Sequence, residues 1–158
     1  MDERAPAPGG LALIEALVNT LDIETGVDSL DTAEGRARLL IEERDLPAAL
    51  ELREALRAAC LAHAGHHPPG AVSPATLGSL LRDAPLLVCV TDDGGAALRP
   101  AVPGPLLSRV AEAIATAVGD GTWARLKACE AEDCRWAYYD RSPAARRRWC
   151  SMSVCGAR

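Results

Sequence analysis

Apolar residues recur every three or four positions through much of the chain before residue 120. From Leu11 to Thr25 this spacing predicts a helix that Gly26 ends. Residues 31–34 (Asp-Thr-Ala-Glu) have the spacing of a capping box and predict a second helix that runs to about Glu43. Capping and proline signals predict further helices over residues 45–63, 73–83 and 106–118.

The helical period is interrupted between residues 86 and 100. Residues 86–91 are a short apolar run, residues 92–95 (Asp-Asp-Gly-Gly) suit a tight turn, and residues 96–100 can return as a second strand. This pattern predicts one β-hairpin within a mostly helical domain. The longest apolar stretches, such as residues 85–90, are far too short to span a bilayer, so no membrane partner is expected.

Amino-acid composition divides the chain into an N-terminal part and a C-terminal part. Ala and Leu supply 30 and 21 of the 158 residues, which favours helix, and all five aromatic residues lie at or after Trp123. Residues 1–128 hold 11 basic and 18 acidic residues, whereas residues 129–158 hold six arginines and four acids. We therefore expect a disordered N-terminus over residues 1–10, a helical domain over 11–121 and a small module over 122–158. The predicted fold class is α+β.

Two of the six cysteines stand apart from the others. Cys60 and Cys89 lie in apolar segments, so both are expected to be buried structural thiols. The first residues show no basic segment followed by an apolar one, and thus no secretory signal. A cytoplasmic location, in which thiols stay reduced, is expected.

The other four cysteines form two pairs, each with four intervening residues: Cys129, Cys134, Cys150 and Cys155. In a reducing compartment such pairs indicate metal ligands, and one structural zinc ion held by four thiolates is the predicted cofactor. Two disulfides, or an iron or iron–sulfur centre, are the alternatives. A closed shell of four thiolates has no open position for water, so the site is not expected to be catalytic.

The segment between the two cysteine pairs is rich in aromatic residues and arginine. Residues 135–140 predict a strand, and Ser142-Pro143 predicts a helix over 144–150. The candidate nucleic-acid contacts are Arg135, Arg141, Arg146, Arg147, Arg148 and Arg158. A solvated, solubilising surface is the plain alternative. Phosphate contact is favoured because the rest of the chain is acidic and the guanidinium group suits phosphate.

The cysteine-rich region resembles the CGNR zinc-finger family, which is found at the C-terminus of bacterial stress-induced transcription regulators. The resemblance rests on Cys-x4-Cys-Arg-Trp-x-Tyr-Tyr-Asp at 129–140 and on Arg-Arg-Trp-Cys-Ser-Met-x-x-Cys-Gly-x-Arg at 147–158. It implies zinc ligation by the four cysteines and a DNA-binding role. Ala157 replaces the asparagine of the family motif, so the bonds of that side chain are absent.

The N-terminal part is similar to the ABATE domain that accompanies this zinc finger. The similarity rests on residues 17–20 (Leu-Val-Asn-Thr) and on the helix start at 31–34. Asn19 and Thr20 on an apolar helix are expected to bond a neighbouring backbone, and lining a ligand pocket is the alternative.

Together these features predict a zinc-finger protein that binds double-stranded DNA and regulates transcription under stress, with the helical domain as sensor or scaffold. Strong sequence specificity from so small a module would need a homodimer. The alternative is a protein–protein adaptor with a purely structural zinc module. No phosphate-binding glycine loop and no nucleophile–base spacing appears in the sequence, so enzyme activity is not expected.

Overall fold

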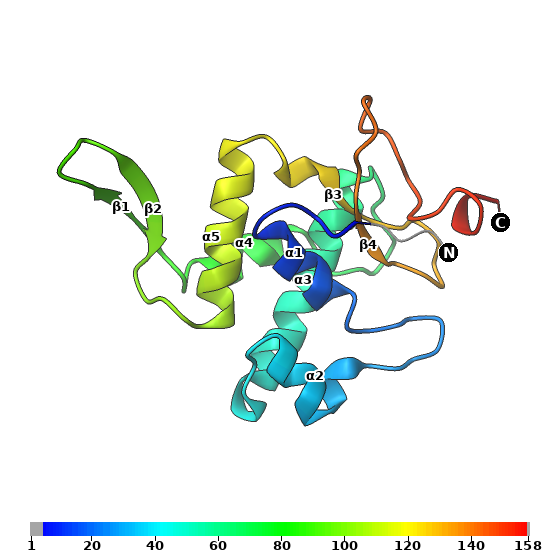
Figure 1. Cartoon of the computed structure of the whole chain (residues 1–158). Helices are drawn as coiled ribbons and strands as arrows, with labels where there is room; N and C mark the ends of the chain where they lie inside the picture. Colours follow the sequence, from blue (N-terminus) through cyan, green and yellow to red (C-terminus); the bar gives the residue numbers. More distant parts are fainter. Residues whose placement is uncertain (1–4, 158) are drawn as a thin grey trace.

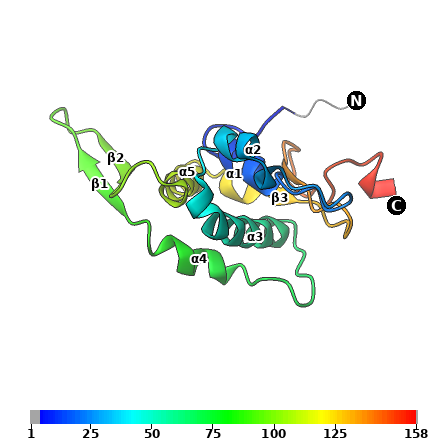
Figure 2. The same cartoon turned by 90° about the horizontal axis from the view of Figure 1, so that it is seen from below.

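Helix α3 (Leu46–His63) lies at the centre of the computed structural model, which describes residues 5–157. It begins with Pro47 in its first turn, as predicted, and ten of its 18 residues are buried. Helices α1 (Leu11–Val18), α4 (Ala75–Leu81) and α5 (Leu106–Gly119) pack against it (Figures 1 and 2). The remaining elements attach to this group of helices.

Residues 5–10 lie against the helical domain, although the sequence predicted disorder over 1–10; residues 1–4 lie outside the described residues. Ala7 is buried, and its N–H donates to the Glu15 carboxylate at 2.6 Å. A Cβ atom on Gly10 would lie 2.7 Å from that of Ala113 in α5. The segment before α1 is therefore packed close to the domain.

Two helices are shorter than predicted. Helix α1 ends at Val18 because Leu21 forms an isolated antiparallel bridge with Asp28, which requires extended backbone. Helix α2 (Ala33–Arg38) ends before Leu40, which adopts the left-handed conformation at φ 55°. The start of α2 is as predicted, since the Thr32 side chain accepts a hydrogen bond from the N–H of Gly35 at 3.0 Å.

The predicted hairpin is confirmed as β1 (Leu86–Val90) paired antiparallel with β2 (Ala96–Pro100). It extends away from α5 at one end of the molecule (Figure 1). Cys89 in β1 is consequently exposed, so the prediction that it is buried was wrong. Cys60 in α3 is fully buried as expected, and burial raises the pKa of its thiol to about 12.

A second small sheet joins the C-terminal region to the helices. Strands β3 (Leu126–Ala128) and β4 (Ala137–Tyr139) are antiparallel, and β3 lies against α3. Leu126, Ala128 and Ala137 belong to the same hydrophobic core as the buried residues of α1, α3 and α5. The core therefore continues past the change in composition near residue 121.

The helices of residues 5–157 include none that is both long enough and apolar enough to cross a membrane.

Gly35 provides a test of the close packing between α2 and the turn before it. A Cβ atom at this position would lie 1.8 Å from the carbonyl oxygen of Ser29. We expect Gly35→Ala to lower the free energy of unfolding by about 1–3 kcal/mol, because backbone must move to relieve the overlap. Urea unfolding measures this change.

The matched control is Gly78→Ala in α4, where an added Cβ meets nothing within 4 Å. There the higher helix propensity of alanine should raise the free energy of unfolding, by up to about 1 kcal/mol. Equal effects of the two substitutions would contradict the close approach at Gly35.

Candidate metal centre and nucleic-acid interface

The first cysteine pair lies on the turn that joins β3 to β4. Cys129 follows β3 directly, and its N–H continues the ladder by donating to the Trp136 carbonyl at 3.0 Å. The turn closes because the N–H groups of Cys134 and Arg135 both donate to the Ala131 carbonyl. Arg135 adopts the left-handed conformation at φ 53°. The turn directs both thiols to one side.

The second pair completes a compact group of four sulfur atoms. Cys134 and Cys150 have their Sγ atoms 3.6 Å apart, and those of Cys150 and Cys155 are 3.7 Å apart. All four Sγ atoms lie within 4.8 Å of one another. Zinc–sulfur bonds of about 2.3 Å in a tetrahedron separate the sulfurs by about 3.8 Å. The cysteines therefore have the spacing of one four-cysteine site typical of a zinc finger.

Without a metal ion, the close packing of these thiols favours their protonated form. Hydrogen bonds with Cys129 and Cys150 raise the pKa of Cys134, and burial raises that of Cys155 to about 11. Four thiolates at this spacing repel one another unless a cation neutralises them. Cys129, Cys134, Cys150 and Cys155 would hold a zinc ion as thiolates, and a bound zinc would supply structural cross-linking rather than a reactive water.

A buried ion pair supports the chain beside the metal site. Asp140 is fully buried, and its carboxylate accepts hydrogen bonds from Lys127 Nζ at 2.9 Å and from the Arg147 N–H at 2.9 Å. Ser142 donates to the same carboxylate through its N–H and its hydroxyl. Burial alone would raise the pKa of Asp140, but these hydrogen bonds outweigh it and hold the pKa well below its usual range.

The same contacts explain why the predicted helix over 144–150 is absent. Lys127 Nζ donates to the Ala145 carbonyl at 2.6 Å, and the Tyr138 hydroxyl donates to the Arg147 carbonyl at 2.8 Å. These carbonyls are thus held by β3 and β4 instead of by a helical turn. Ala145 also has a φ of 48°, which interrupts a right-handed helix. The prediction of a helix here was wrong, whereas the strand predicted in 135–140 is present as β4.

Three of the candidate arginines are exposed: Arg141, Arg146 and Arg148. Arg148 pairs with Glu130 at 2.6 Å, and its guanidinium lies over the Trp149 ring. Arg141 donates to the carbonyls of residues 5 and 6 and lies over the Tyr139 ring. For Arg146, the described residues provide no hydrogen bond, ion pair or ring contact.

The other three candidates are placed differently. Arg135 is buried and donates to the Glu130 carbonyl at 2.8 Å. Arg147 is half-buried and donates to the Cys150 carbonyl at 2.9 Å. Arg158 lies outside the described residues. Both inward-facing guanidinium groups therefore satisfy backbone carbonyls around the cysteines.

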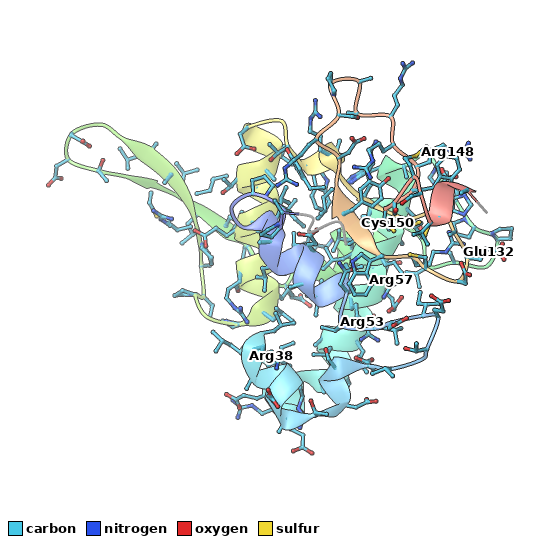
Figure 3. The ribbon with its side chains drawn as sticks, turned by 45° about the vertical axis from the view of Figure 1, so that its right-hand side comes forward. Arg38, Arg53, Arg57, Glu132, Arg148 and Cys150 are labelled. Atoms are coloured by element: carbon cyan, nitrogen blue, oxygen red, sulfur yellow. The ribbon has the colours of Figure 1, made fainter. Side chains whose placement is uncertain are left out.

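Two side chains from the helical domain hold the cysteine turn in place. Asn19 donates to the Ala137 carbonyl at 3.0 Å and accepts from the N–H of the same residue at 2.7 Å, as an adjacent strand would. Arg57 donates to the carbonyls of Val18 and Arg135 at 3.0 and 2.9 Å. Figure 3 shows Arg57 on α3, between Arg53 and the cysteine-rich end.

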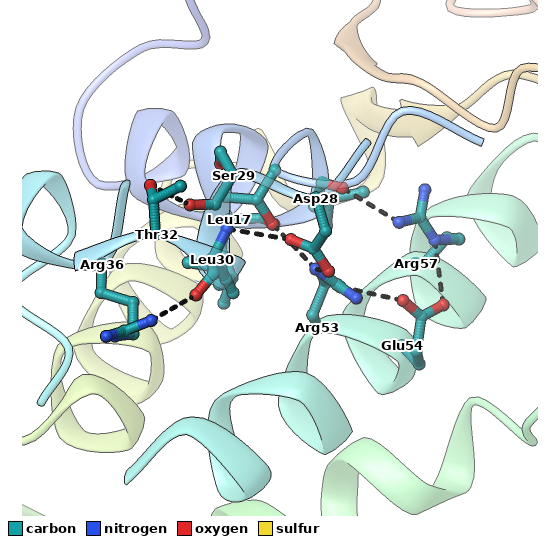
Figure 4. A network of polar contacts seen from close by, with 11 residues as sticks. Leu17, Asp28, Ser29, Leu30, Thr32, Arg36, Arg53, Glu54 and Arg57 are labelled. Carbon is teal, nitrogen blue, oxygen red and sulfur yellow. Dashed lines mark hydrogen bonds and ion pairs between the residues drawn. The ribbon is translucent and has the colours of Figure 1, made fainter. Parts of the chain in front are cut away.

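Arg57 belongs to a larger polar network. It shares Glu54 with Arg53, and Arg53 pairs with Asp28 at 2.7 Å (Figure 4). Sequence reasoning anticipated the backbone bond of Asn19 but missed Arg57, Lys127 and Asp140. Lys127 is the only lysine in the sequence, and Asp140 is the only acid after Cys134. The rarity of these residue types was the one sequence signal that could have marked them as a pair.

Zinc should be required for the order of the cysteine-rich loops. We expect the wild type to contain one zinc ion per chain and Cys150→Ser to lose most of it, with a lower melting temperature. Binding of a structural zinc contributes on the order of 10 kcal/mol, so this loss should be large. Elemental analysis and thermal unfolding measure both effects. Cys89→Ser, which removes an exposed thiol of the hairpin, is the control.

Full zinc content and an unchanged melting temperature in Cys150→Ser would show that the four sulfurs do not act as one site.

Comparison with known families agrees with this geometry. Residues 125–158 match the family model described as CGNR zinc finger. Residues 11–121 match the ABATE model, whose description is "Putative stress-induced transcription regulator". A search of the curated proteins gives no match. Because the second model covers more than half of the chain and the first covers the four-cysteine site, the chain belongs to the ABATE family and carries a CGNR zinc finger.

Proposed function

We propose that the protein is a cytoplasmic transcription regulator that binds double-stranded DNA through the arginines around its zinc site. The zinc ion is structural in this proposal, because four cysteines fill a tetrahedral shell. The role is therefore binding rather than catalysis. The helical domain serves as the scaffold that presents the zinc module.

Arg146, which has no partner among the described residues, carries this proposal. It is exposed on the loop between Asp140 and Cys150, and Arg141 and Arg148 are exposed on the same loop. The guanidinium of Arg141 lies 5.1 Å from the centre of the Tyr139 ring, and that of Arg148 lies 5.1 Å from the centre of the Trp149 ring. These ring contacts limit the motion of both side chains. On binding DNA, Arg141 would exchange the carbonyls of residues 5 and 6, and Arg148 the Glu130 carboxylate, for phosphate oxygens, to which arginine can donate paired hydrogen bonds.

The charge distribution favours one orientation on DNA. Residues 1–128 contain 11 basic and 18 acidic residues, whereas residues 129–158 contain six arginines and four acids. The acidic part is repelled by phosphates, and the basic part is attracted to them. The zinc module should therefore approach the duplex first.

The exposed hairpin supports a homodimer as the DNA-binding form. Cross-strand pairs on one face are Leu86 with Pro100, Val88 with Leu98 and Val90 with Ala96, so this face is entirely apolar. Val88 and Val90 are each 70% exposed. The base of the hairpin packs against α5, where Arg99 pairs with Glu112, but neither edge of this two-stranded sheet pairs with another described strand, and such a sheet is marginally stable in water.

A second copy of the chain fits this apolar face. The face has no charge, so two copies can meet there despite the net charge of −5 on each chain. Asp92 and Asp93 lie at the tip of the hairpin, while Arg99 lies nearer its base. An antiparallel pair about a twofold axis would place each tip beside the opposite base. The hairpin lies opposite the cysteine-rich end (Figure 1), which leaves both zinc modules free for DNA.

Phosphate contact predicts a defined salt dependence. If three arginines per chain each neutralise one phosphate, the logarithm of the binding constant should fall with the logarithm of salt at a slope near −2.7 for each bound module. Arg146→Gln should flatten the slope by about 0.9 and weaken binding to all duplex sequences alike. Fluorescence anisotropy of zinc-loaded protein on a random duplex measures both.

Arg38→Gln is the matched control, because Arg38 is an exposed arginine in α2 (Figure 3) whose side chain is 72% exposed. Its removal should leave the slope unchanged. Absent or salt-independent duplex binding by the wild type would favour the adaptor function instead.

The apolar face of the hairpin leads us to expect a homodimer. We expect sedimentation velocity at micromolar concentration to show a dimer for the wild type and a monomer for Val88→Lys, because a charge on the apolar face would be buried in the pair. Val118→Lys is the control, since Val118 is 60% exposed but lies on α5. A wild-type monomer, or a dimer that survives Val88→Lys, would contradict this interface.

A further inference from the structure

A cavity of about 600 Å³ opens in the helical domain, away from the zinc site. It is bounded by the α2–α3 connection, the N-terminal half of α3, the end of α4 and the first turn of α5. Figure 2 shows α4 lying alongside α3. This volume is in the range of small-molecule sites, which often lie between helices.

The floor of the cavity is apolar. Ile41, Ala49 and Leu52 line it and are at most 6% exposed. Half-buried Leu80 and Leu106 continue the apolar surface toward the opening. Such a floor favours a ligand with an apolar body and gives little to a small hydrophilic ion.

The rim carries an excess of negative charge. Its charged residues are four acids and one arginine: Glu42, Asp45, Glu51, Asp83 and Arg44. Arg44 is 2.9 Å from the Glu42 carboxylate and 4.0 Å from that of Asp45, so its charge is offset within the rim. Glu51 and Asp83 have no ion pair with any described residue. The rim therefore attracts a positive group and repels an anion.

Arg109 holds two walls of this cavity together. Its guanidinium donates to the Leu39 carbonyl at 2.7 Å, just before the α2–α3 connection, and to the Gly104 carbonyl at 3.1 Å, just before α5. The α3 wall is part of the main hydrophobic core. The cavity is thus formed by elements that are fixed without a ligand.

We propose that this cavity binds an organic cation with an extended apolar body, such as a long-chain amine or quaternary ammonium compound. The apolar body occupies the floor over Ala49 and Leu52. The positive group lies at the rim near Glu51 and Asp83. This site is independent of DNA binding by the zinc module, although both regions contact α3.

The test compares two probes of equal chain length and opposite charge, decyltrimethylammonium and decanoate, each kept below its micelle concentration. Isothermal titration calorimetry should show saturable binding of one decyltrimethylammonium per chain. Decanoate should bind at least ten-fold more weakly. No binding of the cation at millimolar concentration, or equal binding of the two probes, would overturn the proposal.

Variants locate the bound cation. Asp83→Asn should weaken binding several-fold, whereas Glu24→Gln, which removes an exposed acid outside the cavity, should not. Ala48→Trp should abolish binding, because Ala48 is an exposed lining residue and the indole would fill the opening without disturbing the core. Circular dichroism checks that this variant is folded. Undiminished binding in folded Ala48→Trp would place the probe elsewhere and overturn the proposal.

Discussion

The guanidinium of Arg57 joins the two halves of the molecule. It donates to the carbonyl of Val18, where α1 ends, and to that of Arg135, in the turn between the first two cysteine ligands. Both hydrogen bonds are buried, and a buried carbonyl left without a partner costs about 1–3 kcal/mol. Asn19 adds a second link by pairing with the backbone of Ala137. These contacts fix the direction in which the zinc module leaves the helical domain.

The C-terminal region therefore has two supports of different kind. The helical domain holds the sheet β3–β4, whose inner residues share its aliphatic core. A second, small cluster holds the loops around Cys129, Tyr138, Cys150 and Cys155, and it depends on metal because it contains few apolar side chains. The exposed arginines lie on these loops, so their positions depend on both supports.

Signals that lie close together in the sequence predicted the structure well. The start of α3 with Pro47 in its first turn, the turn residues of the hairpin and the four clustered cysteines are each signalled by neighbouring residues, and each is confirmed. The predictions failed where distant residues compete for the backbone. Lys127 and Tyr138 take carbonyls from residues 145 and 147, so Ser142-Pro143 does not begin a helix. For the same reason, the inward placement of Arg135 and Arg147 could not be predicted from a run of basic residues.

The exposure of Cys89 has a related cause. An apolar segment indicates burial only when another element covers it, and no described element covers the outer face of the hairpin. Only a partner molecule could cover that face, and a single sequence does not identify such a partner. The conformation of Leu40 at the end of α2 is likewise set by the three-dimensional fold.

Hydrogen exchange of the zinc-free protein tests most directly whether β3 and β4 belong to the helical core. After chelation, we predict that the amides of 126–128 and 137–139 remain protected, since the helical domain holds them, whereas those of 148–157 exchange freely. Loss of protection in β3, β4 and the loops together, with α1 and α3 unaffected, would contradict this account. The C-terminal region would then be an independent zinc-dependent unit.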